Sequence, residues 1–163
     1  MDGHNDSTES RMNSIGQLLS PEDVVLDLDA STKTRVFEEV ARLFEQRHGL
    51  PRAQIVERLT ERETLGSTAL GLGIALPHAR IDNLPQPVVA FVTLKLPIAF
   101  DAPDAKPVSH MMIFLAPQHA TEHHLQMLAE IAQMFGDRRF REQMRSCDSP
   151  AAVCRLFADG AQS

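Results

Sequence analysis

Two apolar runs in the middle of the sequence constrain the fold most strongly. They span residues 88–95 and 108–115 and are rich in β-branched side chains, as the strands of a sheet usually are. A shorter run of the same kind spans residues 24–28. His110 falls within the second long run, where a partly buried strand residue is enough to explain it. We therefore expect a sheet inside the domain.

Helical patterns lie on either side of these runs, because apolar residues recur there at intervals of three and four. The predicted helices span residues 32–48, 51–63 and 121–135. Thr32 and Thr121 suit helix N-caps, whereas Gly49 and Gly136 suit the ends of helices. Two short helices should follow, the last of them beginning at Ser149. Strands and helices mix throughout without an internal repeat, which predicts a single α/β domain.

The length and composition agree with one domain. The chain has 163 residues, of which 43% are hydrophobic, enough for a core of ordinary size. Residues 1–13 are polar and contain almost nothing to bury, so we expect a disordered tail that includes His4, to which no role is assigned. The folded domain is predicted to span residues 14–158, followed by a short C-terminal tail at 159–163.

Several classes of function are disfavoured by composition. The formal net charge of −6 argues against a general nucleic-acid binder, which usually presents a basic face. No run of 18 apolar residues and no basic, apolar leader is present, so we expect a cytoplasmic chain without membrane insertion. Cys147 and Cys154 lie seven residues apart, which suits two small buried side chains better than a redox or zinc pair.

A glycine-rich segment at residues 66–76 invites a nucleotide-binding interpretation, which the spacing excludes. A P-loop requires Lys and Ser or Thr directly after its second glycine, but Leu72 and Gly73 follow Gly71. A dinucleotide fingerprint that starts at Gly71 would require a small residue at position 76, which is Leu76. Neither nucleotide motif is present.

The same segment carries the groups of a phosphate site. Gly66 allows a close approach of its backbone N–H, and the hydroxyls of Ser67 and Thr68 are neutral donors. Arg62 offers a planar cation to phosphate, and His78 offers a nucleophile that is neutral over much of the physiological pH range. From these residues alone, a plain glycine-rich turn that happens to contain a histidine remains the more common explanation.

A second histidine strengthens the phosphate hypothesis. His124 shares a helical stripe with Leu128, Ile131 and Phe135, so we expect it to face the core from the first turn of its helix. Helix N-termini favour anions at that position. The alternatives are a histidine at the edge of the core with its N–H satisfied by a carbonyl, and a zinc site formed with His78 and His123. The zinc site lacks a third Cys or carboxylate ligand at a usual spacing.

Taken together, these motifs resemble the active-site signature of the EIIA domains of the fructose/mannitol class of the bacterial phosphotransferase system. The matching segments are Arg62-Glu63, Gly66-Ser67-Thr68, Gly71-x-Gly73-Ile74-Ala75 and Pro77-His78, supported by residues 97–104 and 121–129. Within this class the chain is most similar to the nitrogen-regulatory EIIA proteins. The resemblance covers residues 14–158.

The resemblance implies both a fold and an activity. The fold would be a mixed β-sheet with helices on both faces. His78 would be phosphorylated on Nε2 by an HPr-like phosphocarrier (NPr), itself charged from phosphoenolpyruvate through Enzyme I, while Arg62 and His124 stabilise the phosphoryl oxygens. No cofactor is implied, and we expect no metal requirement for the transfer. Ala69 departs from the family pattern, which has glycine at this position. If the family glycine adopts a positive φ, alanine would be strained there by roughly 1 kcal/mol. If the position only requires a small side chain, alanine would fit without strain.

Three uses of the phosphate remain open at this point. In the first, the chain is a phosphotransferase component whose phosphorylation state regulates nitrogen-related targets such as potassium transporters or sensor kinases. It could instead be a sugar-specific EIIA that passes phosphate to a separate EIIB/EIIC permease, or purely a regulatory binding module. The sequence contains no recognisable EIIB or EIIC segment, which favours regulation.

Overall fold

A computed structural model describes residues 14–160. The tail predicted at 1–13 and the last three residues of the tail predicted at 159–163 lie outside the described residues. Six strands form one mixed sheet in the order β1-β5-β6-β3-β2, with β4 also pairing with β6. The strands are β1 (Val24–Leu28), β2 (Ala69–Gly71), β3 (Ile74–Ala75), β4 (His78–Ile81), β5 (Val88–Ile98) and β6 (Val108–Pro117). β5 and β6 are antiparallel, whereas β1 runs parallel to β5, and β3 and β4 run parallel to β6. The predicted mixed sheet is confirmed.

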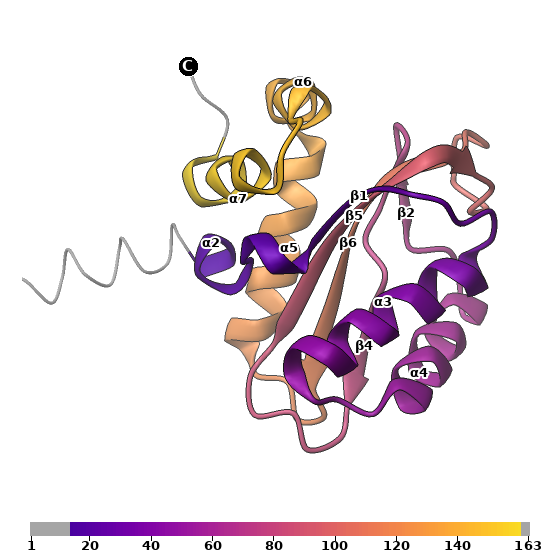
Figure 1. Cartoon of the computed structure of the whole chain (residues 1–163), viewed down its shortest axis with the longest axis vertical. Coiled ribbons are helices and arrows are strands. Elements are labelled where there is room, and N and C mark those ends of the chain that lie inside the picture. The colour runs from indigo at the N-terminus through magenta and orange to yellow at the C-terminus, as the bar shows by residue number, and fades with distance from the viewer. Residues whose placement is uncertain (1–13, 161–163) are drawn as a thin grey trace, which may run out of the picture.

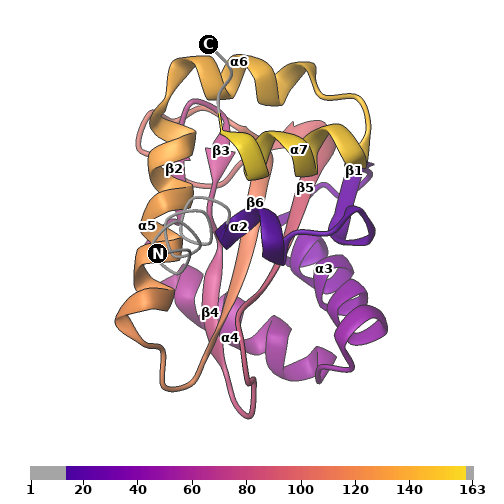
Figure 2. The ribbon, with the colours of Figure 1, turned by 90° about the vertical axis from the view of Figure 1, so that its left-hand side faces the viewer.

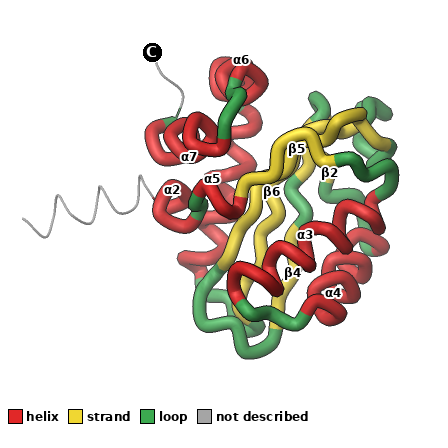
Figure 3. Tube along the Cα trace, in the orientation of Figure 1, coloured by secondary structure: helices red, strands yellow, loops and turns green. Residues whose placement is uncertain are grey.

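Helices cover both faces of this sheet, as expected (Figure 1). One face carries α3 (Lys33–His48) and α4 (Arg52–Thr64). The other carries α2 (Ser14–Leu18), α5 (Glu122–Gly136), α6 (Arg138–Ser146) and α7 (Pro150–Asp159), which Figure 2 shows in front of the strands. A short 3-10 helix, η1 (Pro21–Asp23), leads into β1. The tube in Figure 3 shows the sheet between the two helical layers.

Alternation along the two long strands divides the interior into two cores. On β5, Ala90 and Val92 belong to the core under α3 and α4, whereas Val89 and Phe91 belong to the core under α5 and α7. β6 alternates in the same way, because successive side chains of a strand point to opposite faces. Both faces of these strands are therefore buried, which explains why their sequences read as nearly continuous apolar runs.

Most helix boundaries follow the predicted caps. Thr32 accepts a hydrogen bond from the Arg35 amide at the start of α3, and Gly49 ends that helix with a left-handed φ of 68°. Gly136, predicted to end the helix begun by Thr121, is instead the last residue of α5. Asp137 follows and caps α6 through its side chain, so the break between the two helices is made by this carboxylate. α7 runs to Asp159, one residue past the predicted domain boundary.

The glycine-rich segment forms a hairpin that the sequence did not predict. β2 and β3 pair antiparallel, and the turn between them places Gly71, Leu72 and Gly73 at φ values of 88°, 60° and 81°. The Leu72 amide donates to Asp104, and the Leu72 carbonyl accepts from Arg145. The two glycines therefore serve a left-handed turn that remote side chains hold in place.

Ala69 lies in β2 and is not among the residues with positive φ. Of the two explanations for this departure from the family glycine, the strained one is therefore wrong. The alanine is buried, with an exposed fraction of 6%, in the core under α3 and α4. This position therefore holds a small side chain and does not require a positive φ.

Candidate functional site

A pocket of about 420 Å³ lies where α4, β4, β6 and the first turn of α5 meet. Sequence-predicted residues His78, His124 and Arg62 all line it, although they come from segments separated by up to 62 positions. The remaining lining residues comprise two further arginines, one acid and an apolar wall: Arg58, Arg80, Glu61, Leu65, Ala79, Phe114, Ala116, Ala120, Leu125 and Leu128. The pocket thus joins cationic side chains from α4 and β4 to an apolar surface.

His78 is the first residue of β4 and is half-buried at the pocket. Its Nδ1 lies 2.8 Å from the carbonyl oxygen of Leu76. A carbonyl oxygen can only accept a hydrogen bond, so in the neutral ring Nδ1 carries the proton and Nε2 keeps its lone pair. The local backbone therefore makes Nε2 the nucleophilic nitrogen.

Electrostatics keep this imidazole neutral. Burial lowers the pKa of His78 below the ordinary histidine value of 6.5, because the charged ring would lose hydration. The hydrogen bond to Leu76 opposes this shift, the positive charge of Arg62 adds to it, and Glu63 opposes it. The net direction is downward, so a ring with a free lone pair predominates at neutral pH.

His124 holds the opposite tautomer. It is the third residue of α5, and its Nδ1 accepts a hydrogen bond from the Thr121 amide at 3.2 Å. The proton of the neutral ring must then lie on Nε2, which becomes a donor. In return the Thr121 hydroxyl accepts from the His124 amide at 3.3 Å, completing a capping box with histidine in the place usually held by Glu or Gln.

The predicted helical stripe of His124 is shifted in the structure. The fully buried positions of α5 are Met127, Ile131 and Phe135, whereas His124 and Leu128 are half-buried on the flank of this stripe. That rotation moves the imidazole from the core to the pocket wall. His123, expected to face solvent, is exposed and does not line the pocket.

Positive charge gathers on one side of the pocket. Arg62 donates from Nη1 to the carbonyl oxygen of Gly66 at 2.9 Å, which leaves the rest of its guanidinium for other partners. Arg58 bonds to Asp82 at 3.3 Å, and Arg80 is exposed at the rim. Sequence reasoning missed Arg58 and Arg80. The signal was available: Arg58 is one helical turn before Arg62, and Arg80 is two strand positions after His78, on the same face.

The structure does not bring Gly66, Ser67 and Thr68 into the pocket lining. The Ser67 hydroxyl donates to the carbonyl oxygen of Phe100, and the Thr68 hydroxyl donates to Glu63 at 2.7 Å. Both hydroxyl donors are therefore occupied by acceptors within the protein. The geometry does not support direct phosphate contacts from them.

Among residues 14–160, no three His, Cys, Asp or Glu side chains gather in a way that could hold a metal ion. The zinc arrangement of His78, His123 and His124 considered from sequence is thus not formed there. In the same part of the chain, no helix has the length and apolar character needed to cross a membrane.

Residues 17–160 match the family described as the EIIA 2 component of the phosphoenolpyruvate-dependent sugar phosphotransferase system. A nitrogen regulatory protein of Pseudomonas aeruginosa is 37% identical over 144 residues, which cover 88% of this chain and 94% of that protein.

Solved structures agree with this match. The nitrogen regulatory protein IIA-Ntr of Neisseria meningitidis superposes with a TM-score of 0.83 at 40% identity, covering 88% of this chain and 99% of that one. The mannitol IIA of Escherichia coli superposes with a TM-score of 0.70 over 86% of this chain and 99% of that one. Its identity of 22% establishes a shared fold only.

Proposed function

The chain belongs to the EIIA 2 family of the phosphoenolpyruvate-dependent sugar phosphotransferase system, and we propose that it carries a phosphoryl group on Nε2 of His78. The donor in this proposal is an HPr-like phosphocarrier (NPr). The observation that carries the proposal is the pair of opposite tautomers in one cationic pocket: a lone pair on Nε2 of His78 and a proton on Nε2 of His124. Phosphoryl transfer needs one of each, a nucleophile and a donor to the phosphoryl oxygens.

The transfer proceeds between two imidazoles. The Nε2 lone pair of His78 forms a bond to phosphorus while the donor's nitrogen–phosphorus bond breaks, and that electron pair returns to the donor ring. The His78 ring keeps its Nδ1 proton and acquires positive character, which the Leu76 carbonyl stabilises. Arg62 and Nε2–H of His124 stabilise the negative oxygens, so positioning and charge account for the catalysis.

We further propose that the phosphorylation state is used for regulation. The Pseudomonas aeruginosa relative at 37% identity and the Neisseria meningitidis structure at 40% identity both carry the name nitrogen regulatory protein, whereas the mannitol IIA structure is 22% identical to this chain. Phosphorylation adds about two negative charges beside three arginines and an exposed leucine at the rim, Leu125. A partner that docks over this rim would therefore distinguish the two states, and potassium transporters or sensor kinases are the proposed targets.

The deciding experiment is labelling by phosphoenolpyruvate, Enzyme I and the HPr-like carrier. Wild-type protein should take up acid-labile, base-stable label, and His78→Ala should take up none. His124→Ala should still accept label, but on the order of 10²-fold more slowly, as when one donor to a developing oxyanion is removed. His119→Ala, which alters an exposed histidine outside the pocket, is the matched control and should label normally. Persistent label on His78→Ala would refute the assignment.

Two further labelling experiments test the absence of a metal requirement and distinguish regulation from sugar-specific transfer. Transfer from the already phosphorylated HPr-like carrier to this protein should proceed unchanged with EDTA present, because Arg62 and His124 supply the positive charge and donor that a metal would otherwise provide. Labelled protein mixed with fructose- or mannitol-type EIIB should retain its phosphate under the regulatory proposal. Rapid transfer to such an EIIB would instead support the sugar-specific alternative.

A further inference from the structure

We infer that Glu63 is a positioning residue for His78: through Thr68 and Leu76, it sets the carbonyl group that holds the imidazole in its reactive tautomer. The inference rests on the proposed function for its catalytic meaning, although its structural part can be measured without phosphate. Glu63 does not line the pocket, so it acts without touching the phosphoryl group.

Glu63 is a carboxylate with both oxygens engaged inside the protein. Its side chain is only 6% exposed. One oxygen accepts from the Thr68 amide at 2.9 Å and lies 3.5 Å from Nζ of Lys33. The other accepts from the Thr68 hydroxyl at 2.7 Å. A buried carboxylate that receives two hydrogen bonds from one residue fixes that residue's backbone firmly.

Thr68 passes this constraint to the segment that precedes His78. The Thr68 carbonyl accepts from the Leu76 amide at 3.0 Å, and the Leu76 carbonyl then accepts from Nδ1 of His78 at 2.8 Å. Thr68 and Leu76 are 5% and 4% exposed, so water cannot readily replace these bonds. The β2–β3 hairpin continues the same pairing between Ala69 and Ala75. The glycine turn at its tip thus serves to bring Thr68 beside Leu76.

The far side of the same segment is also held. Pro77 restricts both its own φ and the conformation of Leu76 before it. Its carbonyl oxygen accepts from the Phe114 amide of β6 at 2.9 Å. Leu76 is therefore fixed by β6 through Pro77 and by Glu63 through Thr68. Only the second of these anchors depends on a side-chain charge.

The tautomer matters because it decides where the lone pair lies. Neutral histidine in water favours the proton on Nε2, which would leave Nε2 without a free lone pair. The Leu76 carbonyl reverses this preference by accepting from Nδ1. Displacing that carbonyl would reduce the reactive fraction of His78 even where the ring is neutral.

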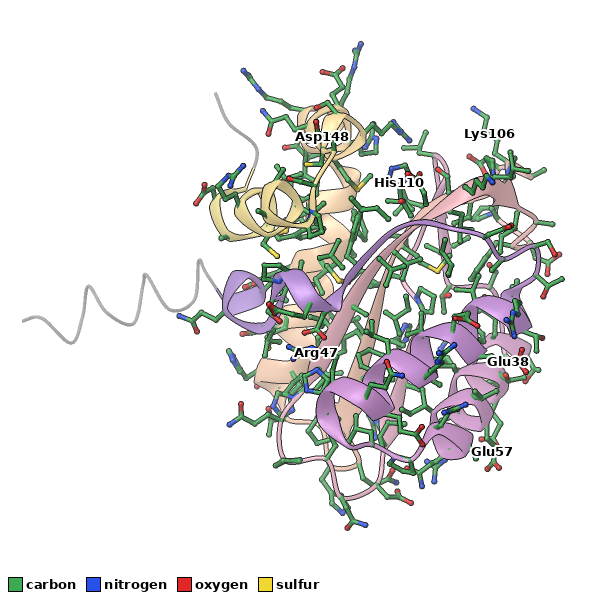
Figure 4. The ribbon with its side chains drawn as sticks, viewed as in Figure 1. Glu38, Arg47, Glu57, Lys106, His110 and Asp148 are labelled. Atoms are coloured by element: carbon green, nitrogen blue, oxygen red, sulfur yellow. The ribbon has the colours of Figure 1, made fainter. Side chains whose placement is uncertain are left out.

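The test compares Glu63→Gln with Glu57→Gln. Both residues lie on α4, but Glu57 is exposed and points away from the sheet (Figure 4). Nitrogen-15 NMR of unphosphorylated, histidine-labelled protein reports which ring nitrogen carries the proton. Wild type and Glu57→Gln should show Nδ1–H at His78, whereas Glu63→Gln should shift toward Nε2–H. The initial rate of labelling by phosphorylated HPr-like carrier should fall about tenfold in Glu63→Gln, the effect of one well-placed hydrogen bond.

A merely structural role would give a different result. Glu63→Gln that folds with the wild-type tautomer overturns the inference, even if labelling slows. Should Glu63→Gln not fold, Thr68→Val removes only the 2.7 Å hydroxyl bond and must show the same shift. If wild-type protein accepts no phosphate at all, the proposed function fails, while the NMR comparison still decides the role of Glu63.

Discussion

At the scale of single residues, two histidines acquire different chemistry from nearby backbone groups. Leu76 offers a carbonyl to Nδ1 of His78, and Thr121 offers an amide to Nδ1 of His124. The partners lie two and three positions away, so each tautomer is determined by local conformation. Arg62 adds a positive charge that, together with burial, lowers the pKa of His78, and in the proposed function the same charge stabilises the phosphoryl oxygens.

The pH dependence of labelling should reveal that charge. Because burial and Arg62 lower the pKa of His78, the rate should rise with pH to a plateau whose midpoint lies below 6.5. Arg62→Gln removes the nearby cation, so its midpoint should move to higher pH and its plateau should fall on the order of 10²-fold. Initial rates with one donor preparation measure both. Arg52→Gln, at the exposed start of the same helix, is the control and should show the wild-type midpoint and plateau. If the midpoint of Arg62→Gln equals that of wild type, the charge of Arg62 does not lower the pKa of His78.

At the scale of elements, close packing of short helices completes one face of the molecule. α2 lies against α7, and Gly16 makes this approach possible. A Cβ on Gly16 would lie 2.6 Å from both Cα and Cβ of Ala158. The Cα belongs to the backbone of α7, so the contact could not be relieved by rotating a side chain.

Gly16→Ala should therefore lower the free energy of unfolding by about 1–3 kcal/mol, the usual cost of overpacking. Gly136→Ala is the matched control, because a Cβ there would meet nothing within 4 Å. That substitution should be neutral or stabilising by up to about 1 kcal/mol, since alanine favours helix. Urea unfolding measures both. The double variant Gly16→Ala/Ala158→Gly should regain part of the lost free energy of unfolding. If Gly16→Ala is as stable as wild type, α2 can move away from α7 and the predicted clash does not occur.

At the scale of the whole molecule, two half-buried histidines couple the stability of the fold to pH. Burial lowers the pKa of both His78 and His110. His110 lies on β6 with its ring 6.3 Å from that of Phe91, and the positive charge of Arg145 lowers its pKa further. Figure 4 shows His110 on the side of the sheet that faces α6.

The sign of the linkage follows from these directions. Below pH 6.5 the unfolded chain binds more protons than the folded one, so stability should fall as pH decreases from 6.5 toward the lowered pKa values. As pH rises above 6.5 this slope declines, and well above 6.5 the two histidines contribute none. His110→Gln should reduce the difference in urea midpoint between about pH 7.5 and about pH 5.5. His119→Gln, at an exposed position, should leave that difference as in wild type. An equal difference in His110→Gln would exclude this residue as a source.

Sequence patterns predicted the parts of this fold whose signals are long and periodic. β5 and β6 were expected from long apolar runs rich in β-branched side chains, and α3, α4 and α5 from helical spacing that persists across them. α2 was missed because five residues are too few to show a period. The hairpin of β2 and β3 was missed because small residues carry little strand preference, and its turn depends on Asp104 and Arg145, which are remote in sequence.

The candidate site likewise contains parts that the sequence could predict and parts that it could not. His78, Arg62 and His124 could be selected as residue types suited to an anion, but their meeting in one pocket depends on how α5 packs beside β4 and α4. The hydroxyls of Ser67 and Thr68 were expected to bind phosphate, because sequence could not show that Phe100 and Glu63 would occupy them. Which nitrogen of each imidazole is free depends on distances to backbone atoms that no spacing rule supplies.

The contact between α2 and α7 has a consequence for how the domain can be connected. These are the first and last helices within the described residues, and they lie side by side in Figure 2. A peptide bridge between them could therefore close the domain into a ring, and a new opening within the largely exposed residues 101–107 would leave every strand that lines the pocket intact. A domain built this way is suited to circular permutation and to insertion as a cassette within another polypeptide.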